Sequence, residues 1–198
     1  MSDELSKLIE TVSIGGPSNW KAALVREYIQ SRELLTKEEQ SHLRVLCRFL
    51  STHSDSSERV DAVEMLGQIG TRSDVFSLKL SCRDVEPMVR CAAVSSLATV
   101  YGKRAFKFLR GLVSEHDPVV RRWTYVAIFD TGHLEAVDWL RSRLDFEHDD
   151  VAKVGILSAL SEAGIAGIKK ELTGLLESDN RYVRKLASEA IANETANN

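Results

Sequence analysis

The chain has 198 residues, 43% of them hydrophobic, and a formal net charge of −3 with both signs interspersed along the sequence. This balance is typical of the solvated surface of a soluble protein and gives no overall basic excess that would hold a nucleic-acid backbone. No uncharged stretch approaches the ~20 residues of a membrane span, and the start of the chain does not resemble a signal peptide. We therefore expect a soluble, cytoplasmic protein without membrane insertion, built as one compact domain or one unbroken solenoid.

Residues 1–35 predict two helices that cap one end of the fold. The first is expected over 5–11 and the second over about 19–32, with a turn at Gly15-Gly16-Pro17 between them. This segment fits the pattern of the following residues poorly, as expected for a terminal unit that covers an otherwise exposed apolar face. At the other end, the polar residues 193–198 predict a frayed tail.

A short phrase recurs between residues 36 and 192, in which an acidic or amide residue is followed four positions later by a basic one. The basic residues that close successive phrases lie 31, 31, 32 and 31 positions apart. A fixed period of this size indicates stacked supersecondary units, here about five. The phrases run over Asp55–Arg59, Glu86–Arg90, Asp117–Arg121, Asp149–Lys153 and Asn180–Arg184.

Residues 102–132 show how one unit is expected to fold. Apolar residues at helical spacing predict an amphipathic helix over 103–113. A break follows, after which Asp117 is the expected N-cap and Pro118 the first helical residue. The second helix is expected to run to about Asp130 and to end at Gly132. The unit is therefore an αα-hairpin, small residues are expected where second helices approach closely, and the chain is predicted to be all-α.

These residues resemble a known family. Asp117-Pro-Val-Val-Arg121, Glu86-Pro-Met-Val-Arg90 and Leu66-Gly-Gln-Ile-Gly70 look like the short bacterial HEAT-like repeat, a type also found in phycobilisome lyases. The resemblance covers about residues 36–192 and implies an α-solenoid, a right-handed superhelix of stacked αα-hairpins. Because the fold hosts many unrelated functions, it does not imply an activity.

The resemblance also implies that acidic and basic residues form a ladder through the stack. The ladder should be weakest where Glu58 replaces a valine in the first copy and where a lysine replaces the arginine of the fourth. Its expected members are Asp55, Arg59, Arg90, Asp117, Arg121, Lys153 and Arg184.

The sequence contains no phosphate-binding loop, zinc-protease motif or nucleophile elbow. A tripeptide repeats at Glu115–Asp117 and Glu147–Asp149, but homologous loops of stacked helices lie roughly 8–10 Å apart, too far to share one ion. Capping loops with solvated histidines are therefore favoured over a metal site. Cys47, Cys82 and Cys91 lack metal or redox spacing and indicate small buried side chains in a reducing compartment, although Cys91 falls on the outer side of its helix. We expect no catalytic residue, no cofactor and no metal.

The strongest candidate site is on the second helix of the third full repeat. Arg122, Tyr125, Val126 and Phe129 are predicted to project onto the inner face, where the equivalent residues of other repeats are small or polar. An arginine with aromatic neighbours is typical of a protein-binding hot spot. The alternative is that these side chains fill gaps left by small residues in adjoining repeats. A basic set on the preceding helix, Lys103, Lys107 and Arg110, is interpreted as a solvated face rather than as a nucleic-acid site.

We expect non-enzymatic binding of another protein through the concave face, either as an adaptor or scaffold or as a small intracellular inhibitor such as an immunity-type partner of a toxin. Two alternatives stay open. The lyase resemblance implies handling of a bilin or another small ligand. Nucleic-acid binding would resemble that of HEAT-like DNA glycosylases, but the inner face would offer mainly Arg122 and Lys185, which disfavours it. The sequence identifies neither the partner nor the oligomeric state.

Overall fold

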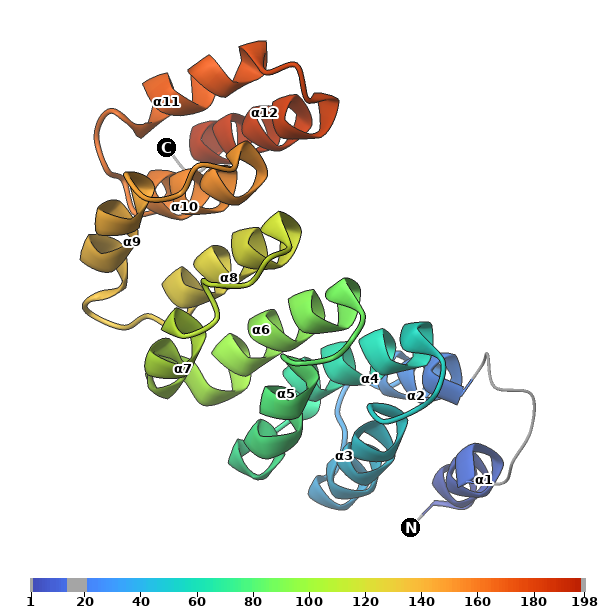
Figure 1. Cartoon of the computed structure of the whole chain (residues 1–198). Helices are drawn as coiled ribbons and strands as arrows, with labels where there is room; N and C mark the ends of the chain where they lie inside the picture. The colour runs from blue at the N-terminus through green and yellow to red at the C-terminus, as the bar shows by residue number, and fades with distance from the viewer. Residues whose placement is uncertain (1, 14–20, 197–198) are drawn as a thin grey trace. The chain divides into compact units, whose positions relative to one another are not determined.

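The structure, a computed structural model, describes residues 2–13 and 21–196, with side chains as far as residue 193. All regular secondary structure in these residues is helical, which confirms the all-α prediction (Figure 1). The expected turn at Gly15-Gly16-Pro17 and the expected helix start near residue 19 lie outside the described residues. The chain divides into two compact units, Met1–Tyr101 (unit 1) and Gly102–Asn198 (unit 2).

Unit 1 places two helices before a pair of helical hairpins. The first two helices are α1 and α2, and the hairpins are α3/α4 and α5/α6, with a short 3₁₀ turn, η1, leading into α5. Their bounds are α1 Asp3–Ser13, α2 Lys21–Gln30, α3 Lys37–Leu50, α4 Ser56–Ile69, η1 Arg72–Asp74, α5 Val75–Ser81 and α6 Pro87–Tyr101.

Unit 2 contains three further hairpins, α7/α8, α9/α10 and α11/α12. Helix α12 continues to Ala196, into the segment for which a frayed tail is expected. The elements are η2 Gly102–Ala105, α7 Phe106–Arg110, α8 Pro118–Asp130, α9 Ala136–Leu144, α10 Asp150–Glu162, α11 Ile168–Gly174, η3 Leu175–Glu177 and α12 Arg181–Ala196.

Helix α7 is shorter than the helix predicted over 103–113. Its lead-in is the 3₁₀ turn η2, and beyond Arg110 the backbone N–H groups of Gly111 and Leu112 bond to carbonyls three residues back. These tighter turns replace the expected α-helical ends. The apolar residues that predicted a longer helix are therefore divided between α7 and the 3₁₀ and turn residues on either side of it.

Acidic caps start three of the second helices. Asp55, Asp117 and Asp149 each accept a hydrogen bond from the backbone N–H two residues on, at 2.8, 2.8 and 2.9 Å. These bonds satisfy N–H groups that have no partner within the helix. Pro118 is the first residue of α8, and Gly132, with φ +63°, follows its end. The structure thus confirms the expected boundaries of this helix.

Small residues let second helices of one unit pack closely. A Cβ atom at Gly67 of α4 would lie 2.5 Å from Ser96 Oγ of α6, and one at Gly155 of α10 would lie 2.5 Å from the carbonyl oxygen of Arg122 on α8. Ser96 Oγ also donates a hydrogen bond of 3.0 Å to the carbonyl oxygen of Val63. This confirms the prediction that small residues mark the close approaches.

All three cysteines are buried, and none forms a disulfide within the described residues. Burial raises the pKa of the Cys47 and Cys82 thiols to about 12, so both stay protonated and unreactive at neutral pH. Cys91 is also buried, so its predicted outward position is wrong. The three side chains therefore act as small core residues, as the sequence indicated.

Candidate functional site

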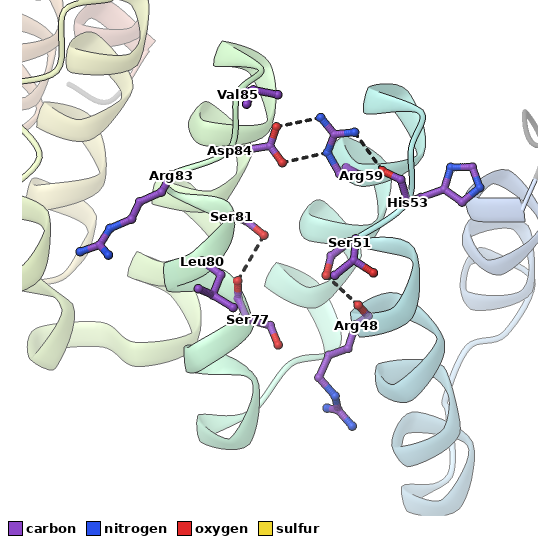
Figure 2. A pocket seen from close by; sticks show the side chains of 11 residues that line it. Arg48, Ser51, His53, Arg59, Ser77, Leu80, Ser81, Arg83, Asp84 and Val85 are labelled. Carbon is purple, nitrogen blue, oxygen red and sulfur yellow. Dashed lines mark hydrogen bonds and ion pairs between the residues drawn. The ribbon is translucent and has the colours of Figure 1, made fainter.

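Arg59 of α4 ties two loops of unit 1 together. Its Nε and Nη2 donate to the two carboxylate oxygens of Asp84, both at 2.8 Å, and Asp84 stands in the loop before α6 (Figure 2). Its Nη1 donates to the carbonyl oxygens of His53 and Ser54, at 2.9 and 3.0 Å, in the loop before α4. One planar guanidinium thus fixes the starts of two successive second helices. We call this arrangement the arginine joint.

Unit 2 repeats the joint at Arg121. Its Nε and Nη2 donate to the Glu147 carboxylate at 2.9 and 3.1 Å, and its Nη1 donates to the carbonyl oxygens of Glu115 and His116 at 2.9 and 3.1 Å. Tyr125 Oη donates a further bond of 2.9 Å to Glu147 Oε2. Partial burial alone would raise the pKa of Glu147, but the bonds from Arg121, the Asp149 backbone and Tyr125 hold it below its usual value.

The predicted ladder needs a correction in its acidic members. Asp55 and Asp117 cap their own helices, whereas the carboxylates that link one repeat to the next belong to Asp84 and Glu147, two residues before the capping position. The caps cannot reach the next repeat because their carboxylates are bonded to the first turn of their own helix. An acidic residue two positions before the cap recurs at Asp84, Glu115 and Glu147. This pattern was the signal in the sequence that could have predicted the linking carboxylates.

The arginines of the ladder share one contact with the carbonyl groups of their own loop. Arg90 Nη1 donates to the carbonyl oxygens of Asp84 and Val85, and Arg184 Nη1 to those of Ser178 and Asp179. These carbonyls stand six and five residues before the arginine, as they do at Arg59 and Arg121. The recurring basic residue therefore holds the loop that precedes its own helix.

The two weak points predicted for the ladder have different outcomes. The first copy is not weak, because Arg59 is fully paired, and Glu58 is buried, accepting hydrogen bonds from the backbone N–H groups of Lys21 and Ala22 at the start of α2. A carboxylate there is favoured by the unpaired N–H groups of a helix N-terminus. At the fourth copy, Lys153 has no ion pair within residues 2–13 and 21–193.

The glutamate and the aspartate of the repeated Glu-His-Asp loops both have structural roles. Their glutamate accepts the backbone N–H of their aspartate, at 3.2 Å in one loop and 3.1 Å in the other, and their aspartate caps the next helix. His116 is 89% exposed, as expected for a solvated histidine. In the part of the chain that the structure describes, no three His, Cys, Asp or Glu side chains gather to hold a metal ion.

The four predicted binding residues of α8 do not share one surface. Tyr125 is completely buried: its ring lies 6.4 Å from that of Trp139 on α9, and its hydroxyl bonds to Glu147. Its predicted surface position is wrong because the hydroxyl completes the joint beneath α8. Arg122, Val126 and Phe129 are half-buried, and the Arg122 guanidinium lies 4.9 Å from the Trp123 ring.

A groove runs between α3 and α5 of unit 1, with a volume of about 450 Å³ (Figure 2). Leu80 and Val85 line it and are more than half exposed, and Phe49 and Phe76, next to the lining residues Arg48 and Ser77, are 53% and 72% exposed. We call it the α3/α5 groove; its lining residues are Arg48, Ser51, Thr52, His53, Arg59, Ser77, Leu80, Ser81, Arg83, Asp84 and Val85.

Two of the three arginines that line the α3/α5 groove form ion pairs with carboxylates of unit 1. Arg48 pairs with the fully buried Asp74, to which Arg44 also lies close, and Arg59 pairs with Asp84. Buried ion pairs that are well hydrogen-bonded keep their charges in place and leave little field for a ligand. The exposed side chains that line this groove therefore include the apolar Leu80 and Val85 together with one cation, Arg83.

Unit 2 has a groove of different chemistry between α7 and α9, with a volume of about 580 Å³, beside a second hollow of about 500 Å³. We call the two together the basic-aromatic groove. The larger hollow is lined by Phe106, Lys107, Arg110, Gly111, Val113, His133, Glu135, Trp139 and Arg143, and the smaller by Lys103, Arg104, Phe106, Lys107, His133 and Leu134.

Aromatic rings hold the cations of the basic-aromatic groove. The Arg110 guanidinium lies 5.3 Å from the rings of both Phe106 and Trp139, and that of Arg143 lies 6.0 Å from Trp139. His133 stacks on Phe106 with ring centroids 4.1 Å apart. The sequence signalled Lys103, Lys107 and Arg110 but not the aromatic contacts, because these come from α9, about 30 residues further on.

The helical hairpins and their repeated joints define an all-α solenoid. Residues 77–161 match the family model for HEAT repeats, which supports the resemblance to HEAT-like repeat proteins. The match is to HEAT repeats in general and does not distinguish the bacterial lyase type. No curated protein matches the chain. No helix within the described residues has both the length and the apolar character that crossing a bilayer requires. HEAT repeats commonly mediate protein interaction, which is the general function that this fold fits.

Proposed function

We propose that the protein is a non-enzymatic, cytoplasmic protein-binding module, acting as an adaptor or as an inhibitor of its partner. The observation that carries this proposal is the exposure of Leu80 and Val85, two apolar side chains that line the α3/α5 groove; the exposed Phe49 and Phe76 neighbour its lining residues Arg48 and Ser77 in sequence. Exposed apolar side chains with polar groups between them are typical of a protein-interaction surface.

The α3/α5 groove suits a partner that offers apolar side chains. Arg48 and Arg59 are already paired with carboxylates of unit 1, so binding does not require a charged ligand. The arginine joint at Arg59 also fixes the groove wall before a partner arrives, which lowers the ordering entropy that association costs. Both features support a preformed apolar docking surface.

We also propose a second contact surface on α8, without the buried Tyr125. Arg122, Val126 and Phe129 keep partial exposure, and the Nε atom of Arg122 is buried with no hydrogen-bond partner. Replacing Phe129 with Ala tests the surface, since it should weaken partner binding at little cost in stability. The bilin-handling and nucleic-acid alternatives rest on resemblance alone.

Affinity capture tests the proposed function. The wild-type protein and a Phe76→Ser/Leu80→Ser variant are immobilised and exposed to lysate of the native host, and retained proteins are identified by mass. Leu34→Ser, which removes a 90% exposed leucine that lines none of these grooves, is the matched control. We expect a specific partner to be retained by the wild type and the control and to be lost from the double variant. Equal retention by all three would reject the α3/α5 groove as the docking surface.

A further inference from the structure

The basic-aromatic groove of unit 2 carries an unusual concentration of positive charge. Five cationic side chains line its two hollows, against the single carboxylate of Glu135, in a chain whose net charge is −3. None of the five has an ion pair within residues 2–13 and 21–193. They are Lys103, Arg104, Lys107, Arg110 and Arg143.

Other arginines of the chain show the contrast. Arg26, Arg32, Arg59 and Arg121 each lie within 4.0 Å of at least one carboxylate. In the basic-aromatic groove, rings take the place of carboxylates as neighbours of the guanidinium groups. The positive charge of the groove is therefore available to a ligand instead of being neutralised inside the fold.

The rings also fix where the charge lies. Arg110 lies over both Phe106 and Trp139, and Arg143 lies between Trp139 and Phe146, 5.5 Å from the latter ring. Cation–π contacts of this kind restrict a guanidinium without occupying its N–H edges. The ordering entropy of two long side chains is then lost before binding, which favours a ligand that needs both.

One donor in the groove lacks an acceptor. The Nε atom of Arg143 is buried and has no hydrogen-bond partner. An unsatisfied buried donor destabilises the fold. The buried Nε is out of a ligand's reach, so a carboxylate in the groove pairs with Arg143 through the part of its side chain that lines the larger hollow.

The ring faces argue against a nucleic-acid ligand. Single strands depend on aromatic faces that are free for bases to stack on. Here Phe106 is buried, with His133 stacked on it, and Arg110 lies over both Phe106 and Trp139. The groove instead offers an apolar neighbour to its cations, since Leu134 lines the smaller hollow and is 90% exposed.

We propose that the basic-aromatic groove binds an extended acidic segment of a partner protein. Its carboxylates pair with Arg110 and Arg143, Lys103 and Lys107 attract it from the rim, and an apolar side chain of the segment packs against Leu134. This surface is independent of the α3/α5 groove, so either one can fail without the other.

A direct binding assay tests the proposal on the full-length protein. The probe is a short fluorescein-labelled peptide of Glu and Leu, compared with peptides that carry Gln or Lys in place of Glu and with a labelled single-stranded oligothymidine. Fluorescence anisotropy reports binding. We expect only the Glu peptide to bind, with an affinity that falls as salt rises, because the pairing is electrostatic.

Charge reversals locate the site. Lys103→Glu/Lys107→Glu leaves the ring contacts of Arg110 and Arg143 in place and should weaken Glu-peptide binding at least about tenfold, a change equal to ~1.4 kcal/mol. Lys169→Glu/Lys170→Glu, at two exposed lysines of α11 outside both hollows, changes the net charge equally; it is the matched control and should bind as the wild type does. Equal binding by both variants, failure of the Glu peptide to bind, or preference for the oligothymidine would each overturn the proposal. Because Phe76 and Leu80 are unchanged in these variants, lysate capture through the α3/α5 groove should persist.

Discussion

The two units share one joint but differ in the groove beside it. In unit 1, two of the three arginines that line the α3/α5 groove, Arg48 and Arg59, are bonded to carboxylates of the same unit, whereas Arg83 is exposed. In unit 2, the guanidinium groups of Arg110 and Arg143 in the basic-aromatic groove lie over the Trp139 ring. Neither arginine has an ion pair among the described residues. The repeated positions build the stack, whereas the positions that vary between repeats set the surface chemistry. We therefore propose apolar recognition for one groove and recognition of carboxylates for the other.

Removing a joint should have the largest effect. Arg121→Ala leaves Glu147 buried without its cation, and loss of one partner of a buried pair typically costs about 3–5 kcal/mol. Arg59→Ala should behave similarly in unit 1, with a somewhat smaller loss because Asp84 is slightly more exposed than Glu147. Urea unfolding measures both, with the exposed Arg141→Ala as control. A loss below about 1 kcal/mol in either variant would contradict the structural role of the joint.

Removing only the hydroxyl of Tyr125 should have a smaller effect. Tyr125→Phe keeps the buried ring but deletes the bond to Glu147, and a hydrogen bond to a charged group contributes about 1.5–3 kcal/mol. Burial and the bond to Glu147 raise the pKa of Tyr125 to about 12, so its stabilising contribution is present below pH 10 and declines as pH rises toward 12. The variant should lose this alkaline component. Unchanged urea unfolding would place Tyr125 outside the joint.

Acid should weaken the joints in a defined direction. Burial opposes ionisation of Asp84 and Glu147, yet hydrogen bonds from Arg59 and Arg121 hold the pKa of each below its usual value. A lowered pKa in the folded state means that the stabilisation is present above about pH 4 and declines as pH falls through the folded-state value. Unfolding free energies measured between neutral and acidic pH should show this decline in the wild type. In Arg121→Ala the decline should be shallower, and an identical slope would argue against the pairing.

The smallest expected effect is a gain at the fourth repeat. Lys153 and Ser178 are separated by the same 25 positions as Arg59 and Asp84, and Ser178 Oγ already accepts the backbone N–H of Asn180 as Asp84 accepts that of Glu86. Lys153→Arg/Ser178→Asp should complete a joint and add about 0.5–1.5 kcal/mol. The single change Ser178→Asp, without the arginine, is the control. Equal stability of the two variants would show that the spacing alone does not make a joint.

The sequence predicted the parts of the molecule that depend on local, repeated signals. The period, the Asp117 cap, Pro118 and Gly132 placed α8 correctly, because caps and turn residues act within a few positions. Tyr125 was misplaced since its helical angle did not reveal that Glu147, on another hairpin, would accept its hydroxyl. The basic-aromatic groove was missed for the same reason: Trp139 and Arg110 meet only after α7 and α9 are packed.

Joints stabilise the fold while grooves bind ligands, and one paired measurement separates the two roles. Unfolding free energy and Glu-peptide affinity are measured side by side for Lys103→Glu/Lys107→Glu and for Arg59→Ala, whose joint belongs to unit 1 and shares no residue with the basic-aromatic groove. The groove variant should lose at least about tenfold in affinity at nearly wild-type stability. Arg59→Ala should lose stability while keeping its affinity for the peptide. If stability and affinity fall together in both variants, the division between joint and groove is wrong.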